Sequence, residues 1–364
     1  MIRWPKSLLR VIAVNIGLLV AAVVIAEAMF GTWLFGTSFG VLNMPRDIAR
    51  SFDLRLIRPG AAPTFYSRDR VGLRGRYESP AAIDILAIGG STTNELYISD
   101  DETWTARLAQ RFAAAGRPLS VVNAGIDGQS TFGNIRNFDL WFPLIPELRA
   151  RYMLAYIGIN DMTLSLGGDN AFQDGYDRIQ NPDRNRRLRQ YIRNHSALYR
   201  MYRVIRGMRL AANADMAYLR VDWAAVGWIE APGSLARPAW DASQLALGLA
   251  AYERRVTELI RRIRAFGSEA IIVTQQKGYW RRQGGKLWVA AGADGAPLAT
   301  DFAELAAFNQ AAMNACRAAR AICLDLALEI EFREGDFYDH LHTSPAGSAR
   351  IADYLYAKLK DRVR

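Results

Sequence analysis

The sequence predicts an α/β fold, a three-layer α/β/α sandwich around a mostly parallel five-stranded sheet, preceded by one N-terminal transmembrane helix. Five short apolar segments of strand length alternate with longer segments whose apolar residues recur at helical spacing. Such alternation is typical of a parallel sheet with helices on both faces. The membrane helix is indicated by an uncharged run, Val11 to Ala26, which Leu8 and Leu9 extend to about the length that spans a bilayer.

Each element of the sandwich is assigned from its own pattern. In residues 103–115, for example, Trp104, Leu108 and Phe112 fall on one helical face. The expected strands are residues 84–88, 119–123, 152–157, 270–274 and 321–326. The expected helices are residues 103–115, 131–141, 242–266, 301–319 and 345–359. A helix therefore follows every strand.

The chain has 364 residues and a formal net charge of +10, carried mostly by arginine. This length suits one large domain or two small ones. A basic protein favours an anionic neighbour, such as a phospholipid surface, an acidic polysaccharide or nucleic acid. Neither zinc-finger spacing nor an aromatic RNA-binding strand occurs in the sequence. We therefore expect no nucleic-acid partner and favour a partner in the cell envelope.

The two cysteines, Cys316 and Cys323, give no metal-binding framework. They could form one disulfide in an oxidising compartment. We favour two unbridged residues, buried on a helix and on the strand that follows it, because neither cysteine lies in a CxxC or another redox motif.

The apolar N-terminal run is interpreted as a signal anchor over roughly residues 8–35. Apolar residues resume after Glu27, whereas a cleaved signal peptide has a shorter apolar core and a small-residue cleavage motif. Trp33 would then lie in the aromatic belt of the membrane interface. Glu27 would lie near the outer interface, where water solvates it.

Basic residues flank the anchor on both sides. Arg3, Lys6 and Arg10 precede the uncharged run from Val11 to Ala26, and Arg46, Arg50 and Arg55 follow the anchor. The first set lies closer to the anchor, and long domains cross a membrane largely regardless of their charge. We therefore place the N-terminus in the cytoplasm and the bulk of the chain on the other side.

Beyond the anchor the chain divides into an arm and a main domain. Residues 1–36 hold the cytoplasmic tip and the anchor, residues 37–80 form a linker or N-terminal arm, and residues 81–364 form the main domain. Loops longer than about 15 residues are uncommon inside a domain. Residues at about 163–240 are therefore interpreted as a helical insertion and residues at about 275–297 as a hairpin insertion, and the arm is expected to pack on the main domain.

The helical insertion contains a basic segment from Arg184 to Arg209, in which Leu188 and Ile192 are among the apolar residues at near-helical spacing. One interpretation is a basic amphipathic helix that lies on an anionic membrane surface or binds a polyanion. The other is a solvated arginine face on a helix that packs against the main domain. We favour the second interpretation.

Short polar clusters follow the first three strands. Ser91 comes after the first strand, Gly128 just beyond the second, and Asn160 after the third. A fourth cluster, residues 337–344, precedes the last helix. Because open α/β sheets bind ligands at the carboxyl ends of their strands, we expect the four clusters to meet in one cleft.

Acyl transfer needs a hydroxyl nucleophile, an oriented base and hydrogen-bond donors for an oxyanion. Ser91 supplies the hydroxyl, and the sequence offers three histidines as bases: His195, His340 and His342. His195 lies in the basic segment and is interpreted as structural. We favour His342 over His340, because Asp339 three residues earlier can turn back to hold the imidazole of His342.

The four clusters resemble, in order, the sequence blocks of the SGNH hydrolases, also called the GDSL esterase/lipase superfamily. The matching residues are Gly89-Gly90-Ser91-Thr92, Asn123 to Gly128, Gly158 to Asp161 and Asp339 to His342. The resemblance covers about residues 84–362 and implies the flavodoxin-like SGNH hydrolase fold. Gly90 stands where the family usually has an aspartate, and the Gly-Gly-Ser-Thr-Thr form looks typical of membrane-anchored envelope members.

The resemblance also implies a role for each site residue. Ser91 would be the nucleophile, His342 the base and Asp339 the residue that orients the base. The backbone N–H groups of Ser91 and Gly128 and the side chain of Asn160 would form the oxyanion hole. No metal or organic cofactor is expected.

We expect an SGNH/GDSL-type serine esterase that acts through an acyl-enzyme on an O-acylated envelope substrate, a polysaccharide or a lipid. The expected location is the bacterial inner membrane, with a single span and the catalytic domain on the periplasmic side. An O-acyltransferase that modifies an envelope polysaccharide would use the same Ser-His-Asp site, because a sugar hydroxyl would only replace water. A catalytically degenerate domain that binds glycan or acts as a scaffold is a third interpretation, which the intact site argues against.

Overall fold

The computed structural model describes residues 5–34, 44–55, 60–165, 184–199, 201, 202, 205 and 221–363. The chain forms two compact units. The larger unit comprises residues 44–177 and 218–364, and the smaller comprises residues 1–43 and 178–217.

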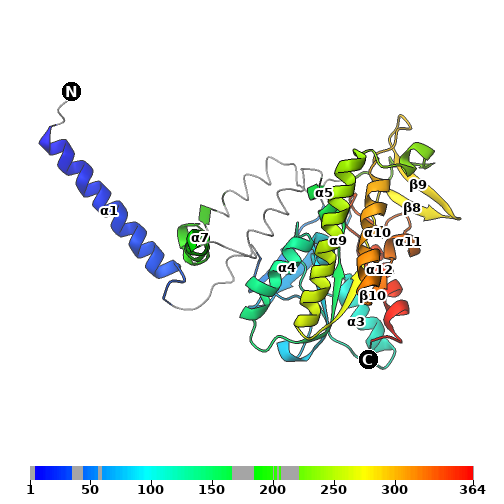
Figure 1. Ribbon diagram of the computed structural model, residues 1–364, viewed down its shortest axis with the longest axis horizontal. Coiled ribbons are helices and arrows are strands. Elements are labelled where there is room, and N and C mark those ends of the chain that lie inside the picture. The colour runs from blue at the N-terminus through cyan, green and yellow to red at the C-terminus, as the bar shows by residue number, and fades with distance from the viewer. Residues whose placement is uncertain are drawn as a thin grey trace. The chain divides into compact units, whose positions relative to one another are not determined.

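A five-stranded parallel sheet forms the centre of the larger unit (Figure 1). Its strand order is β10-β7-β5-β3-β4. The strands are β3 Ile83–Gly89, β4 Val121–Asn123, β5 Ala150–Tyr156, β7 Glu269–Val273 and β10 Ile322–Leu324. Every neighbouring pair is parallel. The predicted sheet is therefore confirmed, and its strands read as apolar runs because both of its faces are covered.

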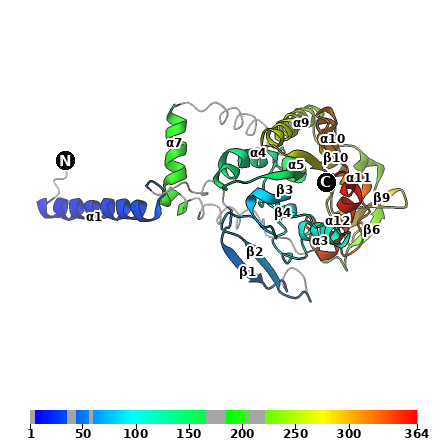
Figure 2. The same ribbon diagram turned by 90° about the horizontal axis from the view of Figure 1, so that it is seen from below.

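Helices cover both faces of this sheet. Helices α3 and α12 lie on one side, and α4, α9 and α10 lie on the other (Figure 2). The helices are α2 Ser91–Asn94, α3 Trp104–Ala114, α4 Thr131–Leu140, α5 Ile159–Ser165, α9 Ala242–Ala265, α10 Phe302–Ala318, α11 Leu326–Glu329 and α12 Pro345–Leu359, with short 3₁₀ turns at Pro80–Ala82, Phe142–Leu144 and Gly233–Ala236. The three-layer sandwich predicted from the sequence is thus the observed fold.

The amphipathic spacing explains how α3 packs on the sheet. Trp104, Leu108 and Phe112 are fully buried, and they form a core with Ile85 of β3 and Leu355 of α12. Burying a side chain of this size stabilises the fold by roughly 1.5–3 kcal/mol. The apolar face of α3 therefore fixes this helix on the face of the sheet that it shares with α12.

Two smaller antiparallel sheets belong to the same unit. The first pairs β1 Ile48–Phe52 with β2 Thr64–Arg68. The second has the order β6-β9-β8 and consists of β6 Gly227–Glu230, β9 Lys286–Ala291 and β8 Trp280–Gln283. The turn between β8 and β9 is formed by Gly284 and Gly285, whose φ angles are 60° and 77°. Such positive φ values favour glycine at both positions.

The interpretation of the two cysteines as unbridged is wrong. Cys316 of α10 and Cys323 of β10 form a disulfide, with their Cα atoms 5.8 Å apart. The α-carbon distance is typical of disulfides. The turn that reverses the chain between α10 and β10 brings the two side chains together, and spacing alone gave no sign of this because the pair has no motif.

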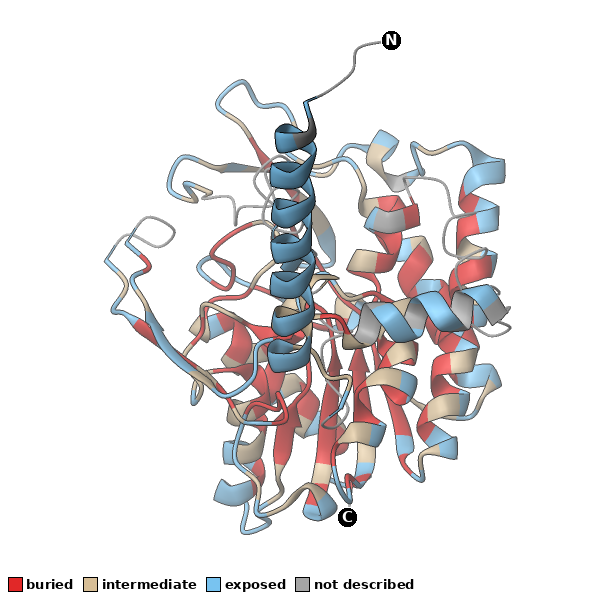
Figure 3. Cartoon of the chain, turned by 90° about the vertical axis from the view of Figure 1, so that its left-hand side faces the viewer, coloured by how far each residue is buried: buried red, intermediate tan, exposed pale blue. Residues whose placement is uncertain are grey.

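In the smaller unit, helix α1 Lys6–Phe30 is exposed along nearly its whole length (Figure 3). Its part Ser7–Phe30 is long and apolar enough to cross a membrane, with a mean hydropathy of 2.6 over its most apolar 18 residues. A signal sequence near the N-terminus can pass the same test of length and composition. The end of the expected anchor, at residue 35, lies outside the described residues.

A second helix of the smaller unit, α7 Arg184–His195, contains the start of the basic segment. The described part of this segment belongs to the same compact unit as α1. The later arginines of the segment, at positions 200, 203, 206 and 209, lie outside the described residues.

Glu27, which is partly exposed, accepts hydrogen bonds from the protein. Its two oxygens accept hydrogen bonds from Trp33 Nε1 at 2.8 Å, Ser196 Oγ at 2.6 Å, and the backbone nitrogens of Ala197 and Leu198 at 2.9 and 3.1 Å. The carboxylate therefore joins the end of α1 to the chain directly after α7. Residues 170 positions apart make this contact, which no local pattern could reveal.

Candidate active site

Ser91 stands at a sharp turn between strand and helix. Strand β3 ends at Gly89, and Ser91 begins α2. Gly89 has φ 157°, and a Cβ at this position would lie 2.6 Å from the carbonyl oxygen of Tyr156. Glycine is therefore required here. The turn presents the Ser91 hydroxyl at the carboxyl edge of the sheet, where the sequence placed it.

The structure brings Ser91, His342 and Asp339 together. The Ser91 Oγ lies 2.8 Å from His342 Nε2, and His342 Nδ1 lies 2.7 Å from Asp339 Oδ2. The side chains of His342 and Asp339 are 12% and 1% exposed. With the Nδ1 proton donated to the carboxylate, Nε2 can accept the hydroxyl proton of Ser91.

The turn that carries His342 is held by the same carboxylate. Asp339 Oδ1 accepts hydrogen bonds from the backbone nitrogens of Leu341 at 2.7 Å and His342 at 2.6 Å. The carbonyl of His340 accepts a bond of 2.8 Å from Gly278 N, just beyond β7. Asp339 thus shapes its own turn with one oxygen and orients the imidazole with the other.

The two other histidines have different surroundings. The ring of His340 stacks on Tyr279 at 5.7 Å, and burial lowers the pKa of His340. His195 lies in the smaller unit, where its Nδ1 is 2.8 Å from the carbonyl oxygen of Thr32. Of the three histidines, His342 is the one that the structure places in hydrogen-bond contact with Ser91.

Asn160 lies beside the nucleophile turn. Asn160 is in the first turn of α5, and its Nδ2 donates to the carbonyl of Gln129 at 2.9 Å, the residue after Gly128. This bond leaves the second amide hydrogen available. A Cβ on Gly90 would overlap Asn160 Nδ2 and reach the Gln129 carbonyl at 3.0 Å. The absence of a side chain at position 90 therefore allows the amide to lie next to Ser91.

Gln275, which the sequence analysis did not identify, connects two parts of the site. Its Oε1 accepts from the backbone N–H of Ile159 at 2.9 Å, and its Nε2 donates to Thr92 Oγ1 at 2.7 Å. Gln275 is 3% exposed. It holds the turn before Asn160 against the turn that carries Ser91. Its position two residues after β7, at the same sheet edge, is the one signal that the sequence offered.

A buried ion pair between Asp161 and Arg255 lies next to Asn160. Asp161 accepts hydrogen bonds from Thr131 N and Oγ1 at 2.9 and 2.5 Å, and lies 3.3 Å from Arg255 Nη2. Burial raises the pKa of Asp161, and the Arg255 charge and the Thr131 bonds oppose that rise. These contacts anchor the start of α5 to α4 and α9.

Glu95 is a second residue that sequence reasoning missed. It directly follows α2, and its Oε1 accepts from Thr343 Oγ1 at 3.0 Å and from Ser348 Oγ, while its Oε2 accepts from Trp104 N at 2.7 Å. Burial raises the pKa of Glu95 to about 7. Since Thr343 follows His342, Glu95 ties the end of the nucleophile helix to the histidine turn.

No cluster of three or more His, Cys, Asp or Glu residues that could hold a metal occurs in the part of the chain that the structure describes. The arrangement instead combines a hydroxyl, an oriented imidazole and the side-chain amide of Asn160 next to the nucleophile turn. Such a combination is suited to nucleophilic attack on a carbonyl and to stabilising the oxyanion that results.

The family model for GDSL-like lipases and acylhydrolases matches residues 87–350. This range covers well over half of the chain and contains Ser91, Gly128, Asn160, Asp339 and His342. The chain belongs to the GDSL-like lipase/acylhydrolase family and is a serine esterase of that type. The resemblance stated from its four sequence blocks is thereby confirmed.

Comparison with known proteins gives two further findings. No match emerges among curated protein sequences. Among solved structures, TesA is 14% identical with a TM-score of 0.41, and the match covers 76% of this chain and 98% of TesA. The esterase EstA from Pseudoalteromonas sp. is 13% identical with a TM-score of 0.41, covering 76% and 97% of the two chains. The acetyl xylan esterase AlAXEase is 10% identical with a TM-score of 0.41, covering 76% and 98%.

Proposed function

We propose that this protein hydrolyses esters through an acyl-enzyme formed on Ser91. The observation that carries the proposal is the continuous hydrogen-bonded chain from Ser91 Oγ through His342 to Asp339, with links of 2.8 and 2.7 Å. A serine hydroxyl is a weak nucleophile until an adjacent base accepts its proton. His342 is in position to do so.

The reaction proceeds in two halves. Ser91 Oγ attacks the ester carbonyl as His342 Nε2 takes its proton, and the imidazolium then protonates the departing alcohol, which leaves an acyl group on Ser91. In the second half, water gives a proton to His342 and attacks the acyl carbonyl. Collapse of that intermediate releases the acid and returns the proton to Ser91.

We propose that the oxyanion of each tetrahedral intermediate is stabilised by the N–H groups of Ser91 and Gly128 and by the amide of Asn160. The Ser91 N–H lies in the first turn of α2, where backbone donors have no partner within the helix. Asn160 Nδ2 uses one hydrogen for the Gln129 carbonyl, so the second can face the oxyanion. Each such donor is typically worth about 100- to 1000-fold in rate.

We propose an O-acylated polysaccharide or lipid of the cell envelope as the substrate, and a location in the bacterial inner membrane with the catalytic domain on the periplasmic side. Three features support this location: the apolar helix α1, the basic residues Arg3, Lys6 and Arg10 that precede its uncharged run, and the disulfide between Cys316 and Cys323. Disulfides persist in oxidising compartments such as the periplasm and are rare in the cytosol.

The proposed division of the chain follows from this location. Residues 1–36 would hold the cytoplasmic tip and the anchor, and residues 37–80 the arm. Residues 81–364 would form the catalytic domain, with insertions at about 163–240 and about 275–297. The match of the family model to residues 87–350 supports the start of the catalytic domain near residue 81.

We further propose that α7 rests on an anionic membrane surface. If α1 spans the bilayer, its end lies at the surface, and Glu27 there accepts hydrogen bonds from Ser196, Ala197 and Leu198 directly after α7. Within α7, Leu188 and Ile192 are 59% and 44% exposed. An apolar stripe on an arginine-rich helix suits the boundary between lipid headgroups and acyl chains.

The depth of α7 can be measured with single cysteines. Because both native cysteines are bridged, Leu188→Cys or Arg189→Cys would supply one free thiol for a fluorophore in the full chain. In vesicles containing anionic lipid, spin-labelled lipid should quench the label at position 188 more strongly than the label at the neighbouring, exposed position 189. Equal quenching at the two positions would contradict the contact.

Hydrolysis itself is tested with the full chain in detergent. Wild type should cleave p-nitrophenyl acetate, and Ser91→Ala should lower kcat by at least about 10³-fold. Ser234→Ala, which changes an exposed serine of the same unit, is the matched control and should retain full activity. Wild-type activity in Ser91→Ala would refute the nucleophile. Faster acetyl transfer to an added oligosaccharide than to water would refute hydrolysis as the main reaction.

A further inference from the structure

The arm that precedes the family match contains two buried arginines. Arg68, at the end of β2, and Arg74, six residues later, are 3% and 2% exposed. Both lie outside residues 87–350, which the family model matches, yet both belong to the same compact unit as Ser91. A buried guanidinium is costly unless its donors are satisfied, so its partners indicate its purpose.

Arg68 connects the nucleophile helix to the loop that follows β4. Its Nη2 donates to Asn94 Oδ1 at 2.6 Å and to the carbonyl of Gly125. Its Nη1 donates to the carbonyl of Gly72 at 2.6 Å, and its Nε donates to the hydroxyl of Tyr66 at 2.6 Å. Asn94 is the last residue of α2, the helix that begins with Ser91, and Gly125 lies three residues before Gly128.

Asn94 carries the connection further along the same loop. Its Oδ1 accepts from Arg68, and its Nδ2 donates to Asp127 Oδ1 at 2.7 Å, on the residue before Gly128. A Cβ on Gly125 would overlap the backbone nitrogen of Asn94. The loop is therefore packed directly on the end of α2, and Arg68 holds the two together by hydrogen bonds.

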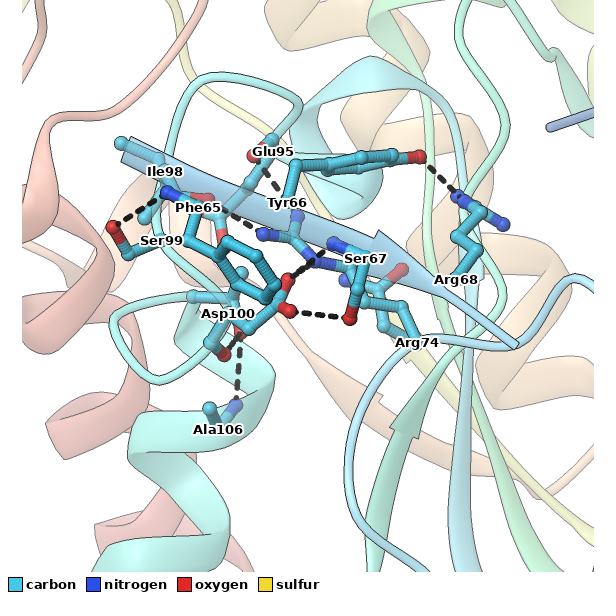
Figure 4. A network of polar contacts seen from close by, with 12 residues as sticks. Phe65, Tyr66, Ser67, Arg68, Arg74, Glu95, Ile98, Ser99, Asp100 and Ala106 are labelled. Carbon is cyan, nitrogen blue, oxygen red and sulfur yellow. Dashed lines mark hydrogen bonds and ion pairs between the residues drawn. The ribbon is translucent and has the colours of Figure 1, made fainter. Parts of the chain in front are cut away.

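Arg74 caps the same helix from its carboxyl end (Figure 4). Its Nη1 donates to the carbonyl of Glu95 at 3.0 Å, its Nη2 to that of Ile98 at 2.5 Å, and its Nε to Asp100 Oδ1 at 2.7 Å. Its Nη1 also donates to the carbonyl of Asn94, the last residue of α2, which has no partner within the helix. Arg74 also exchanges two backbone hydrogen bonds with Asn123, the last residue of β4.

We infer that Arg68 is a positioning residue for the oxyanion hole, and that the arm is part of the active site. This inference rests on the function proposed above. Donors stabilise an oxyanion only when they lie about 2.7–3.1 Å from it, so a small shift of the Gly128 loop relative to Ser91 weakens them. The planar guanidinium of Arg68 donates to four acceptors at once. A lysine ammonium in the same place cannot reproduce this fork-shaped arrangement of N–H donors.

The variant Arg68→Lys keeps the positive charge and removes the fork. With p-nitrophenyl acetate we expect kcat to fall by about 10- to 100-fold, with KM within about 3-fold, because the loss concerns the transition state. The diagnostic measurement compares this ester with its thionoester, whose sulfur accepts hydrogen bonds weakly. The oxoester-to-thionoester rate ratio should fall at least about 5-fold in Arg68→Lys, because the lost interaction is one that only an oxyanion makes strongly.

Two further variants keep the test decisive. Arg70→Lys changes an exposed arginine of the same arm and should leave kcat and the rate ratio at wild-type values. Asn94→Ala breaks the link from the other side and should lower the ratio in the same direction, even if Arg68→Lys does not fold. An unchanged ratio in folded Arg68→Lys or Asn94→Ala, with hydrolysis still dependent on Ser91, would overturn the inference alone. Hydrolysis that does not depend on Ser91 would overturn the proposed function and the inference together.

Discussion

Replacing Asp339 by asparagine separates the two tasks of this carboxylate. The amide oxygen can keep the Oδ1 bonds to the backbone nitrogens of Leu341 and His342, which now measure 2.7 and 2.6 Å. The amide NH₂ then faces His342 Nδ1, which must become an acceptor. In that tautomer Nε2 carries the proton and cannot take one from Ser91.

The size of the effect follows from the geometry. Asp339 Oδ2 lies 2.7 Å from His342 Nδ1, and the Asp339 side chain is 1% exposed. At an effective dielectric constant of about 20, two unit charges about 4 Å apart interact by about 4 kcal/mol. This attraction arises only while His342 is protonated, so its loss raises the barrier by about that amount, or about 10³-fold in rate. The wrong tautomer extends the expected loss of kcat to about 10³- to 10⁴-fold.

The assay is hydrolysis of p-nitrophenyl acetate by the full chain, with thermal unfolding measured on the same samples. Asp339→Asn should lose this activity while unfolding within a few degrees of wild type. Asp339→Ala, which also removes the backbone acceptor, should be less stable by about 2–3 kcal/mol. A loss of kcat smaller than about 10-fold in Asp339→Asn would refute the reasoning, because the imidazole would then not depend on the carboxylate.

Three other predictions concern residues around the site. Gly90→Ala should lower kcat by about 10- to 100-fold, measured with p-nitrophenyl acetate, because its Cβ would displace the Asn160 amide; unchanged kcat would show that the amide has room to move. The raised pKa of Glu95, about 7 against 4.5, means that its contribution to stability is complete below about pH 4.5 and is lost as the pH rises through about 7. Urea unfolding should therefore show about 2 kcal/mol less stability at about pH 8 than at about pH 5, and Glu95→Gln should lack this difference. Reduction of the Cys316–Cys323 disulfide should lower the unfolding free energy by about 2–3 kcal/mol in the wild type and have no effect on a variant with both cysteines changed to serine.

The fold and the central site were predictable because their signals are local. The apolar run before Gly89 ends at a turn, and the observed strand Ile83–Gly89 differs from the predicted one by one residue at each end. Asp339 and His342 are three positions apart, so one turn brings them together. Their contact with Ser91 spans 251 positions, and the rule that parallel strands share one functional edge was enough to anticipate it.

The supporting residues were not predictable from the same signals. Arginine and glutamate are usually solvated, so Arg68, Arg74 and Glu95 gave no sign of being buried. Many of their partners are backbone carbonyls and hydroxyls contributed by distant segments, and only the folded chain brings these groups together. The hydrogen bonds of Glu27 in the smaller unit were not predictable for the same reason, because its partners after α7 lie about 170 positions away.

At Gly90 the sequence and the structure each explain part of what is observed. In the sequence, Gly90 stands where the first block of the family usually has an aspartate. The structure gives a physical account of the departure, because the Asn160 amide lies where a side chain at position 90 would begin. The missing side chain at position 90 therefore leaves room for the Asn160 amide.

The nucleophile is the central claim, and locating a covalent adduct tests it most directly. The full chain in detergent would be treated with a fluorophosphonate, which reacts with activated serines, and the modified peptide would be identified by mass spectrometry. We predict one phosphonyl group per chain, on Ser91, formed in proportion to the loss of ester hydrolysis. Complete inactivation with Ser91 unmodified, or an adduct on a different serine, would contradict the account.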